Sequence, residues 1–268
     1  MTGEGHLDGE VMPGGMANAG AVVRHGDIVE RPAPPHAAAL HAHLVALAAQ
    51  GFDGVPVPLG ITGSGRRERL SYVPGDVAVP PHPPWAWTDD ALRSVGGLLR
   101  RLHSASAGLP LDAAAGWSAE LADPQGAGAA GALLCHNDVC LENVVFRDGR
   151  AAALIDFDHA APGRPLWDVA MAARYWVPMS GRDGLDRAHR LRVLADGYGL
   201  ERADRAALPG VIEEATGVCR AFVERRVASG DPTYAKALDA GGGWGRWDRH
   251  QAWLADRRDE LTTALLAG

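Results

Sequence analysis

The sequence predicts an α+β protein with two lobes: a small, mostly β N-terminal lobe and a larger helical C-terminal lobe with an embedded β-hairpin. Three observations support this prediction. Short β-patterned segments precede a Pro-rich stretch at 74–85, helical patterns dominate after that stretch, and a single Asp-Gly hairpin signal interrupts them. We therefore expect an N-terminal lobe over 1–73, a hinge over 74–85 and a C-terminal lobe over 86–268.

The N-terminal lobe is expected to contain a small sheet and one helix. Residues 21–24 and 27–31, separated by His-Gly, are typical of a tight hairpin. Residues 34–51 carry Pro near the start and Gly at the end, as helices often do. Two further strands are expected at 54–61 and 68–73. The Pro-rich stretch that follows is not expected to continue a strand or helix, because Pro lacks the backbone N–H donor.

The C-terminal lobe is expected to be mainly helical. Thr88 is a suitable N-cap for a helix whose first turn carries two acids. Residues 144–146 and 152–155 flank an Asp-Gly dipeptide, which is the strongest short signal for a β-hairpin. Four further segments have helical character: 165–177, 185–199, 203–229 and 244–267.

Composition limits the compartment and the partners. The 268 residues are 47% hydrophobic and 22% charged, and no apolar run approaches the roughly 20 residues that span a bilayer. The first residues do not resemble a signal peptide, and three cysteines are too few for a disulfide framework. The net charge of −7 argues against nucleic acid or anionic membranes as partners. We expect a cytoplasmic monomer or homodimer.

The predicted hairpin brings together groups that suit a divalent metal. Asn143 comes directly before its first strand and Asp156 directly after its second, so the two residues should lie about 5 Å apart across the ladder. Their oxygens are hard ligands of the kind that Mg²⁺ takes, together with water and substrate phosphates. Asp138 lies on a loop that must curl under the same end and offers a free carboxylate. This arrangement indicates phosphoryl transfer.

The spacing of these residues matches the catalytic loop of eukaryotic-type kinases. His136-x-Asp138-x4-Asn143, with Asp156 thirteen positions later, is that pattern. Asp138 would orient the acceptor hydroxyl and take its proton, while Asn143 and Asp156 would hold Mg²⁺. His136 is expected to hold the loop through hydrogen bonds, and Asp168 to tie it to the helix beneath.

The same residues resemble a known family. The segment "CHNDVCLENVVF", followed by "LIDFDHAAPGRPLWDVA", is similar to the aminoglycoside phosphotransferase and choline-kinase-like family, in which the loop usually reads His-Gly-Asp. The similarity extends over most of residues 14–177. It implies a protein-kinase-like fold and ATP-dependent phosphorylation of a small-molecule hydroxyl. Asp158 could be a second metal ligand or a surface acid, and both interpretations stay open.

Nucleotide contacts are expected in the N-terminal lobe. The segment "GGMANAG", with Gly15 and Asn18, precedes the first hairpin and could cover the ATP phosphates with backbone N–H groups. A flexible terminus is the alternative interpretation. The backbone from Ser71 to Val73, at the end of a strand, would pair with adenine.

The chain departs from the kinase pattern at the phosphate-binding lysine. The only Lys is Lys236, so Arg31 at the end of "DIVER" is the natural replacement, since its planar fork can bind phosphate oxygens. The acid that usually pairs with that lysine is missing too, because none lies between Arg31 and Asp53. An arginine that is always charged could need no orienting partner, or Glu30 or Glu68 could serve instead. The alternative for Arg31 is that it merely ends an exposed strand. The alternative to a substitute acid is that ATP binding is weakened.

We interpret the chain as an ATP- and Mg²⁺-dependent phosphotransferase that acts on a hydroxyl of an amino sugar, antibiotic or amino alcohol. Acids in the C-terminal helices could favour a cationic acceptor: Glu213, Glu214, Glu224, Asp231 and Asp248. The alternative is a nucleotide-binding pseudokinase with a regulatory or scaffold role. The missing Lys–Glu pair supports that alternative, and the intact Asp138, Asn143 and Asp156 oppose it.

Overall fold

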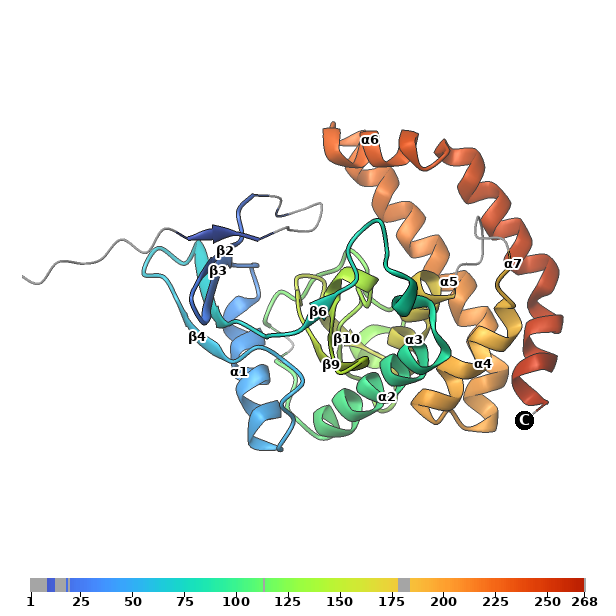
Figure 1. Ribbon diagram of the computed structural model, residues 1–268, viewed down its shortest axis with the longest axis horizontal. Coiled ribbons are helices and arrows are strands. Elements are labelled where there is room, and N and C mark those ends of the chain that lie inside the picture. Colours follow the sequence, from blue (N-terminus) through green and yellow to red (C-terminus); the bar gives the residue numbers. More distant parts are fainter. Residues whose placement is uncertain (1–8, 13–17, 19, 113, 178–183, 268) are drawn as a thin grey trace, which may run out of the picture.

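A five-stranded antiparallel sheet and one helix form the N-terminal lobe, at the left of Figure 1. The computed structural model describes residues 9–12, 18, 20–112, 114–177 and 184–267. The strand order in this sheet is β1-β2-β3-β5-β4, and the helix α1 contacts β4. The elements are β1 (Glu10–Val11), β2 (Val23–His25), β3 (Ile28–Pro32), α1 (Ala37–Ala49), β4 (Pro58–Ile61) and β5 (Arg67–Ser71).

The C-terminal lobe places helices around two small sheets, as Figure 1 shows. One sheet has the order β6-β8-β9 and the other pairs β10 with β7. The elements before α3 are β6 (Asp76–Val77), α2 (Asp89–Ser106), β7 (Leu133–Cys135), β8 (Val144–Arg147), β9 (Arg150–Leu154) and β10 (Ala161–Gly163). The helices that follow are α3 (Pro165–Trp176), α4 (Arg187–Tyr198), α5 (Arg202–Ala228), α6 (Pro232–Ala240) and α7 (Gly243–Leu266).

Local chemistry explains the two best-defined elements. The Thr88 hydroxyl accepts a hydrogen bond from the Ala91 backbone N–H at 3.2 Å, which caps α2 as predicted. Asp148 and Gly149 both have positive φ angles, 51° and 74°, at the tip of the β8–β9 hairpin. This backbone twist matches that of the flanking strands, and it explains why Asp-Gly predicted the turn.

The Pro-rich stretch differs from the prediction. Residues Asp76 and Val77 form the short strand β6, which pairs with Phe146 and Val145 of β8. The expectation that 74–85 contains no strand was therefore wrong for these two residues. They are not prolines, so both keep the N–H donor that a strand requires. The chain thus leaves the N-terminal sheet and joins the β8–β9 hairpin directly.

The helices α2 and α4 pack closely against each other in the C-terminal lobe. A Cβ atom at Gly96 would lie 2.6 Å from the Leu194 carbonyl oxygen, and one at Gly197 would lie 2.3 Å from the Arg93 carbonyl oxygen. Only glycine therefore fits where the two helix backbones meet. No helix within the described ranges combines the length and apolar character that a membrane span requires.

Candidate active site

The loop after β7 is fixed by the carboxylate of Asp168, near the start of α3. Its Oδ2 accepts a hydrogen bond from the His136 backbone N–H at 2.7 Å, and its Oδ1 accepts one from the Asn137 N–H at 2.7 Å. Asn137 has a φ angle of 66°, a conformation that Asn tolerates better than most residues. Asp168 is fully buried. The prediction that it ties the loop to the helix is confirmed.

His136 fixes the same loop from the other side. The Asp138 backbone N–H donates to its Nδ1 at 3.2 Å, so Nδ1 is an acceptor and Nε2 carries the proton. Nε2 then donates to the carbonyl oxygen of Ile155 at 2.9 Å. His136 therefore connects the loop to the segment that precedes Asp156, and the predicted structural role is confirmed.

The carboxylate of Asp138 is held at both oxygens. The Tyr175 hydroxyl of α3 donates to Oδ1 at 2.9 Å, and the Asn143 amide Nδ2 donates to Oδ2 at 3.1 Å. Each carboxylate oxygen has a further lone pair, so Asp138 can still accept a hydrogen bond from a substrate hydroxyl. Burial raises the pKa of Asp138 above the usual value, because its charged form is poorly solvated. These properties suit a general base.

Asn143 and Asp156 both lie at the open end of the hairpin, but they are not the cross-strand pair that the sequence predicted. The Asn143 carbonyl oxygen accepts a hydrogen bond from the Ile155 N–H at 3.0 Å, which places Asn143 across from Ile155 and beside Asp156. The Asn143 Nδ2 group donates hydrogen bonds to Asp138, so the side-chain oxygen Oδ1 remains available as a metal ligand. Asp156 has a φ angle of 65°, an uncommon conformation that is often found at functional sites. The pair therefore fits the hard-oxygen ligand set of Mg²⁺.

Arg31 connects the two lobes at this point. Its Nε donates to Glu68 Oε1 at 2.7 Å, its Nη1 to Asp156 Oδ1 at 2.8 Å, and its Nη2 to Asp158. Glu68 is the cross-strand neighbour of Arg31 and is fully buried, with His41 Nε2 2.7 Å from its other oxygen. Burial favours the neutral form of Asp156, but the Arg31 charge outweighs it and lowers the pKa of Asp156.

The Arg31 contacts resolve one open question from the sequence. The acid that pairs with Arg31 comes from β5, as Glu68, and not from the helix that follows β3. Glu30, the other candidate, pairs with Arg67 and Arg69. Asp158 is not a free surface acid, because Arg31 binds one of its oxygens and the Asn18 amide donates to the other at 2.8 Å.

Replacing Arg31 with Ala is expected to lower kcat/KM for ATP by about 10- to 100-fold, mainly through a higher KM. The guanidinium is the only described cation that bonds Asp156, and a charge-assisted hydrogen bond contributes about 1.5–3 kcal/mol. Steady-state kinetics at varied ATP would measure the effect. Arg69→Ala, on the same sheet, is the matched control and should leave the kinetics unchanged. Unchanged ATP affinity and turnover in Arg31→Ala would contradict the assignment.

The other nucleotide-binding predictions have mixed outcomes. Gly15 lies outside the described residues, whereas Asn18 lies beside Asp158, close to the catalytic loop. The Ser71 N–H already donates to the Val57 carbonyl oxygen at 2.8 Å, so this group is not free for adenine. Val73 follows the strand, and its backbone has no hydrogen-bond partner among the described residues. Val73 therefore remains the better candidate for the adenine contact.

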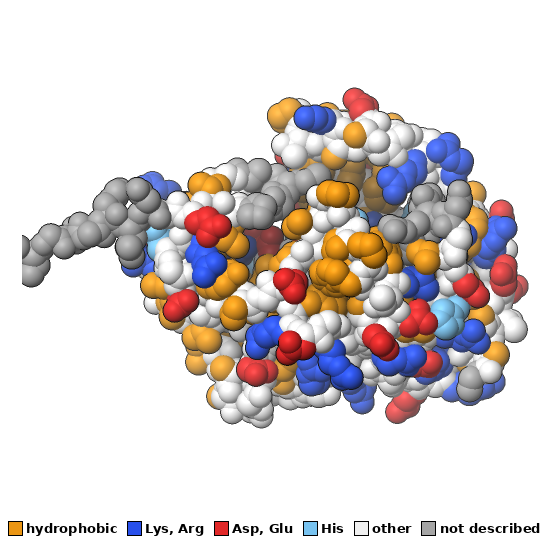
Figure 2. Space-filling view, viewed as in Figure 1, with side chains coloured by type: hydrophobic (Ala, Val, Ile, Leu, Met, Phe, Trp, Pro, Cys, Tyr) orange, Lys and Arg blue, Asp and Glu red, His pale blue; other side chains and the backbone are white. Residues whose placement is uncertain are grey.

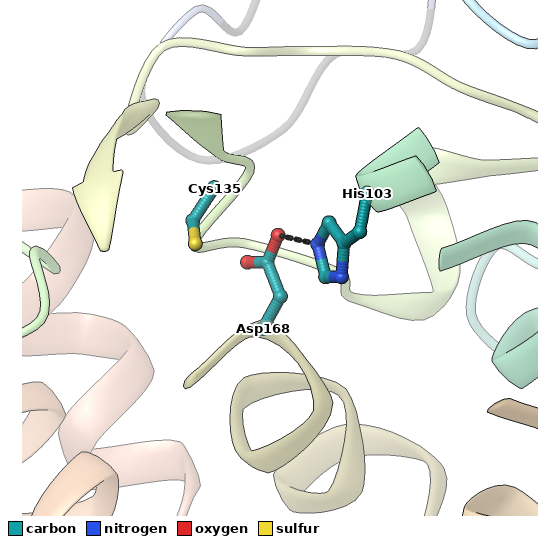
Figure 3. Close-up of side chains that lie close together, drawn as sticks. All are labelled: His103, Cys135 and Asp168. Carbon is teal, nitrogen blue, oxygen red and sulfur yellow. Dashed lines mark hydrogen bonds and ion pairs between the residues drawn. The ribbon is translucent and has the colours of Figure 1, made fainter. Parts of the chain in front are cut away.

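A second polar cluster lies behind the loop and has a structural role. Figure 3 shows Asp168 between His103 and Cys135, at distances that a metal ion could bridge. The Nε2 atom of His103 is hydrogen-bonded to Asp168 Oδ2 at 3.1 Å, and its Nδ1 atom is hydrogen-bonded to the Tyr198 hydroxyl at 2.9 Å. Burial raises the pKa of the Cys135 thiol, which donates to the Arg164 carbonyl oxygen at 3.3 Å. The lone pairs and protons of this cluster are thus already used within the protein.

The acids that suggested a cationic acceptor are all occupied. Glu213 bonds Arg258, Glu214 bonds Arg164, and both Glu224 and Asp248 bond Arg220, while Asp231 caps α6. Paired surface carboxylates attract a ligand cation weakly, because the arginine charge cancels theirs. The four acids paired with arginine therefore give little support to a cationic acceptor, and Asp231 uses its carboxylate on the N-terminus of α6.

The structure adds residues that sequence reasoning missed. Tyr175 contacts Asp138, and His41 supports Glu68. The cross-strand position of Glu68 could have been found by aligning 27–31 with 68–73 as antiparallel neighbours. Nothing in the spacing of Tyr175, 37 residues beyond Asp138, indicated that contact.

Figure 2 shows hydrophobic side chains gathered at the centre of this face, below α6.

Comparison with known proteins identifies relatives along the whole chain. Residues 109–208, which include the catalytic loop, match the model of the phosphotransferase enzyme family. The chain is 30% identical over 262 residues to the trifolitoxin immunity protein of Rhizobium leguminosarum bv. trifolii. That alignment covers 91% of this chain and 94% of the relative.

Solved structures share the fold. A choline/ethanolamine kinase family protein from Mesorhizobium loti has a TM-score of 0.69 at 17% identity, covering 98% of this chain and 95% of its own. An amicoumacin kinase, in complex with AMP-PNP, Ca²⁺ and its ligand, has a TM-score of 0.63 at 13% identity, covering 95% and 88%. A macrolide 2'-phosphotransferase from Brachybacterium faecium has a TM-score of 0.56 at 19% identity, covering 89% and 92%. The chain belongs to the phosphotransferase enzyme family, with the protein-kinase-like fold of the aminoglycoside phosphotransferases and choline kinases, and is a small-molecule kinase.

Proposed function

We propose that this protein uses ATP and Mg²⁺ to phosphorylate a hydroxyl group of a small molecule, such as an amino sugar, an antibiotic or an amino alcohol. The observation that carries the proposal is the convergence of Asp138, Asn143 and Asp156 at the end of one hairpin, beside Arg31. A base, two oxygen ligands and a fixed cation are the parts that phosphoryl transfer requires.

Asp138 acts on the acceptor. Its carboxylate accepts the hydrogen bond of the acceptor hydroxyl, orients that oxygen towards the γ-phosphorus, and takes the proton as the new P–O bond forms. The bond between the γ-phosphorus and the β–γ bridging oxygen breaks, and ADP leaves with that oxygen. Tyr175 and Asn143 keep the carboxylate in one orientation during these steps. Most of the acceleration comes from this positioning and from charge neutralisation.

Asn143 Oδ1 and the Asp156 carboxylate would hold Mg²⁺, which neutralises charge on the β- and γ-phosphates when bound. Arg31 would bind phosphate oxygens in place of the usual lysine, with Glu68 fixing its orientation. We place this activity in the cytoplasm, where ATP is available and the three cysteines, all free in the structure, stay reduced.

The names of related proteins support a protective role for the reaction. One relative is an immunity protein against trifolitoxin, and structural neighbours phosphorylate macrolides and amicoumacin. We propose that the acceptor is a toxic or antibiotic compound that phosphorylation inactivates. Expression of the wild-type protein and of Asp156→Ala in a susceptible host, followed by growth with each compound, would test this role.

The decisive test is transfer of radiolabelled γ-phosphate from ATP to a panel of amino sugars, macrolides, amino alcohols and sugars, with and without Mg²⁺. Transfer by the wild type that disappears in Asp156→Ala is the expected result, since this carboxylate is one of the proposed metal ligands. Tight ATP binding with neither transfer nor slow hydrolysis would favour a pseudokinase instead. Dependence of ATP hydrolysis on Asp156 separates the two functions even if the panel lacks the true acceptor.

A further inference from the structure

His159 lies next to the catalytic loop and has no role in the proposed chemistry. Its ring stands edge-on to Phe222 of α5, with the centroids 5.5 Å apart. Phe222 in turn contacts Tyr234 of α6 edge-on, at 5.3 Å. Phe222 and Tyr234 are buried, whereas 15% of the His159 side chain is exposed. The two aromatic rings therefore form a fixed wall, and His159 is the member of this group that a ligand can reach.

Two charged side chains continue the cluster. The Glu120 carboxylate lies 3.7 Å from His159 Nδ1 and accepts a hydrogen bond from Arg226 Nη2 at 2.9 Å. His159 Nδ1 has no hydrogen-bond partner among the described residues. A carboxylate on that side favours the tautomer with the proton on Nδ1, because the N–H then points towards the negative charge. The other ring nitrogen, Nε2, is left as a hydrogen-bond acceptor.

The cluster is adjacent to the proposed base. The His159 carbonyl oxygen accepts a hydrogen bond at 2.8 Å from the Asn137 amide, and Asn137 directly precedes Asp138. A molecule bound with its hydroxyl at Asp138 would therefore also meet His159.

We propose that His159, oriented by Glu120, is a specificity residue that accepts a hydrogen bond from a second hydroxyl or an ammonium group next to the reactive hydroxyl of the acceptor. This inference rests on the proposed function. Arg226 forms an ion pair with Glu120, and Glu120 lies beside His159, so these three side chains from separate parts of the chain form one connected cluster. An acceptor without the neighbouring donor leaves His159 Nε2 without a hydrogen-bond partner, and sites built to hydrogen-bond a substrate group reject analogues that lack it.

The test uses the acceptor with the highest kcat/KM in the panel and its analogues with a hydroxyl, an amine or hydrogen at the neighbouring carbon. Glucose, glucosamine and 2-deoxyglucose are one such set. Wild-type protein is expected to discriminate at least tenfold against the deoxy analogue, about the effect of one hydrogen bond. His159→Phe, which keeps the ring contact with Phe222, should reduce this discrimination to about twofold. Comparison of the hydroxyl and amine analogues shows which hydrogen-bond donor His159 recognises.

Controls separate specificity from structure. The thermal unfolding midpoint of His159→Phe should match that of the wild type, and His189→Phe, which removes an exposed His–Asp pair at α4, should behave as wild type in every assay. Discrimination that persists in His159→Phe overturns the inference while the kinase assignment stands. If the Phe variant is unstable, His159→Gln and Glu120→Gln provide the same comparison. Wild-type protein without transfer or hydrolysis would overturn the proposed function itself, and this inference with it.

Discussion

Replacing Asp138 with Ala is expected to lower kcat by about 10²–10⁴, with little change in ATP affinity. This is the usual contribution of a general base. Asp138 has no hydrogen bond to Arg31 or Asp156 among the described residues, and its contact with the proposed metal site is the Asn143 amide, whose Oδ1 stays in place without it. Single-turnover transfer and nucleotide titration would measure the two quantities separately. Asp248→Ala, an exposed acid on α7, is the matched control. An equal loss of ATP affinity and turnover would show that Asp138 has another role.

The pH dependence of the reaction should report the same carboxylate. Burial raises the pKa of Asp138, and a base works only when it is unprotonated. Activity should therefore fall on the acid side as the pH drops through a pKa above the ordinary Asp value of 3.8. The kcat/KM profile of the wild type would show this acid limb. The residual activity of Asp138→Ala should lack it.

Replacing Asp168 with Asn is expected to lower the free energy of unfolding by about 3–5 kcal/mol. The side chain is fully buried and accepts hydrogen bonds from two backbone N–H groups and from His103, so an amide would place donors against donors. Urea unfolding at neutral pH would measure the change. Asp196→Asn, which affects an exposed pair with Arg205, should change stability by less than about 1 kcal/mol.

The Asp168 effect should depend on pH in a defined direction. Burial favours the neutral carboxyl, but the His103 hydrogen bond and charge outweigh it and lower the pKa of Asp168 below 3.8. A depressed native pKa stabilises the fold above the unfolded pKa, and the stabilisation is lost as the pH falls through the native value. The difference in the free energy of unfolding between wild type and Asp168→Asn should therefore narrow below about pH 4. A difference that widens at low pH would contradict the hydrogen-bond network with an ionised Asp168.

The core of the site was predictable because it depends on local geometry. The Asp-Gly turn sets the pairing of β8 with β9 near the tip, and a bulge between Val145 and Phe146 shifts it by one residue, so that Asn143 lies across from Ile155, the neighbour of Asp156. Asp138 follows from its spacing to Asn143. Arg31 was identified by elimination, since no lysine was available in the N-terminal lobe. Each of these inferences needed only short-range pattern and chemical type.

The remaining contacts depend on how distant elements pack. Tyr175 reaches Asp138 only because the fully buried Trp176 docks α3 on the loop, donating to the Val139 carbonyl oxygen at 3.0 Å. His159 meets Glu120 through the placement of a long connection that has no periodic pattern. The strands β1, β6, β7 and β10 have two or three residues each, too few to show an alternating pattern. These features are tertiary, so a single sequence does not reveal them.

The position of Arg31 has a consequence for the order of ligand binding. Its guanidinium, carried by β3, forms ion pairs with Asp156 and Asp158 and so links β3 to the segment that follows β9. A metal ion that arrives alone must compete with this cation for Asp156. Under the proposed function, ATP phosphates would offer Arg31 another anionic partner and release the carboxylate, so nucleotide and metal should each strengthen the binding of the other. Arg31 would thereby make the site selective for the metal–nucleotide complex over either component alone.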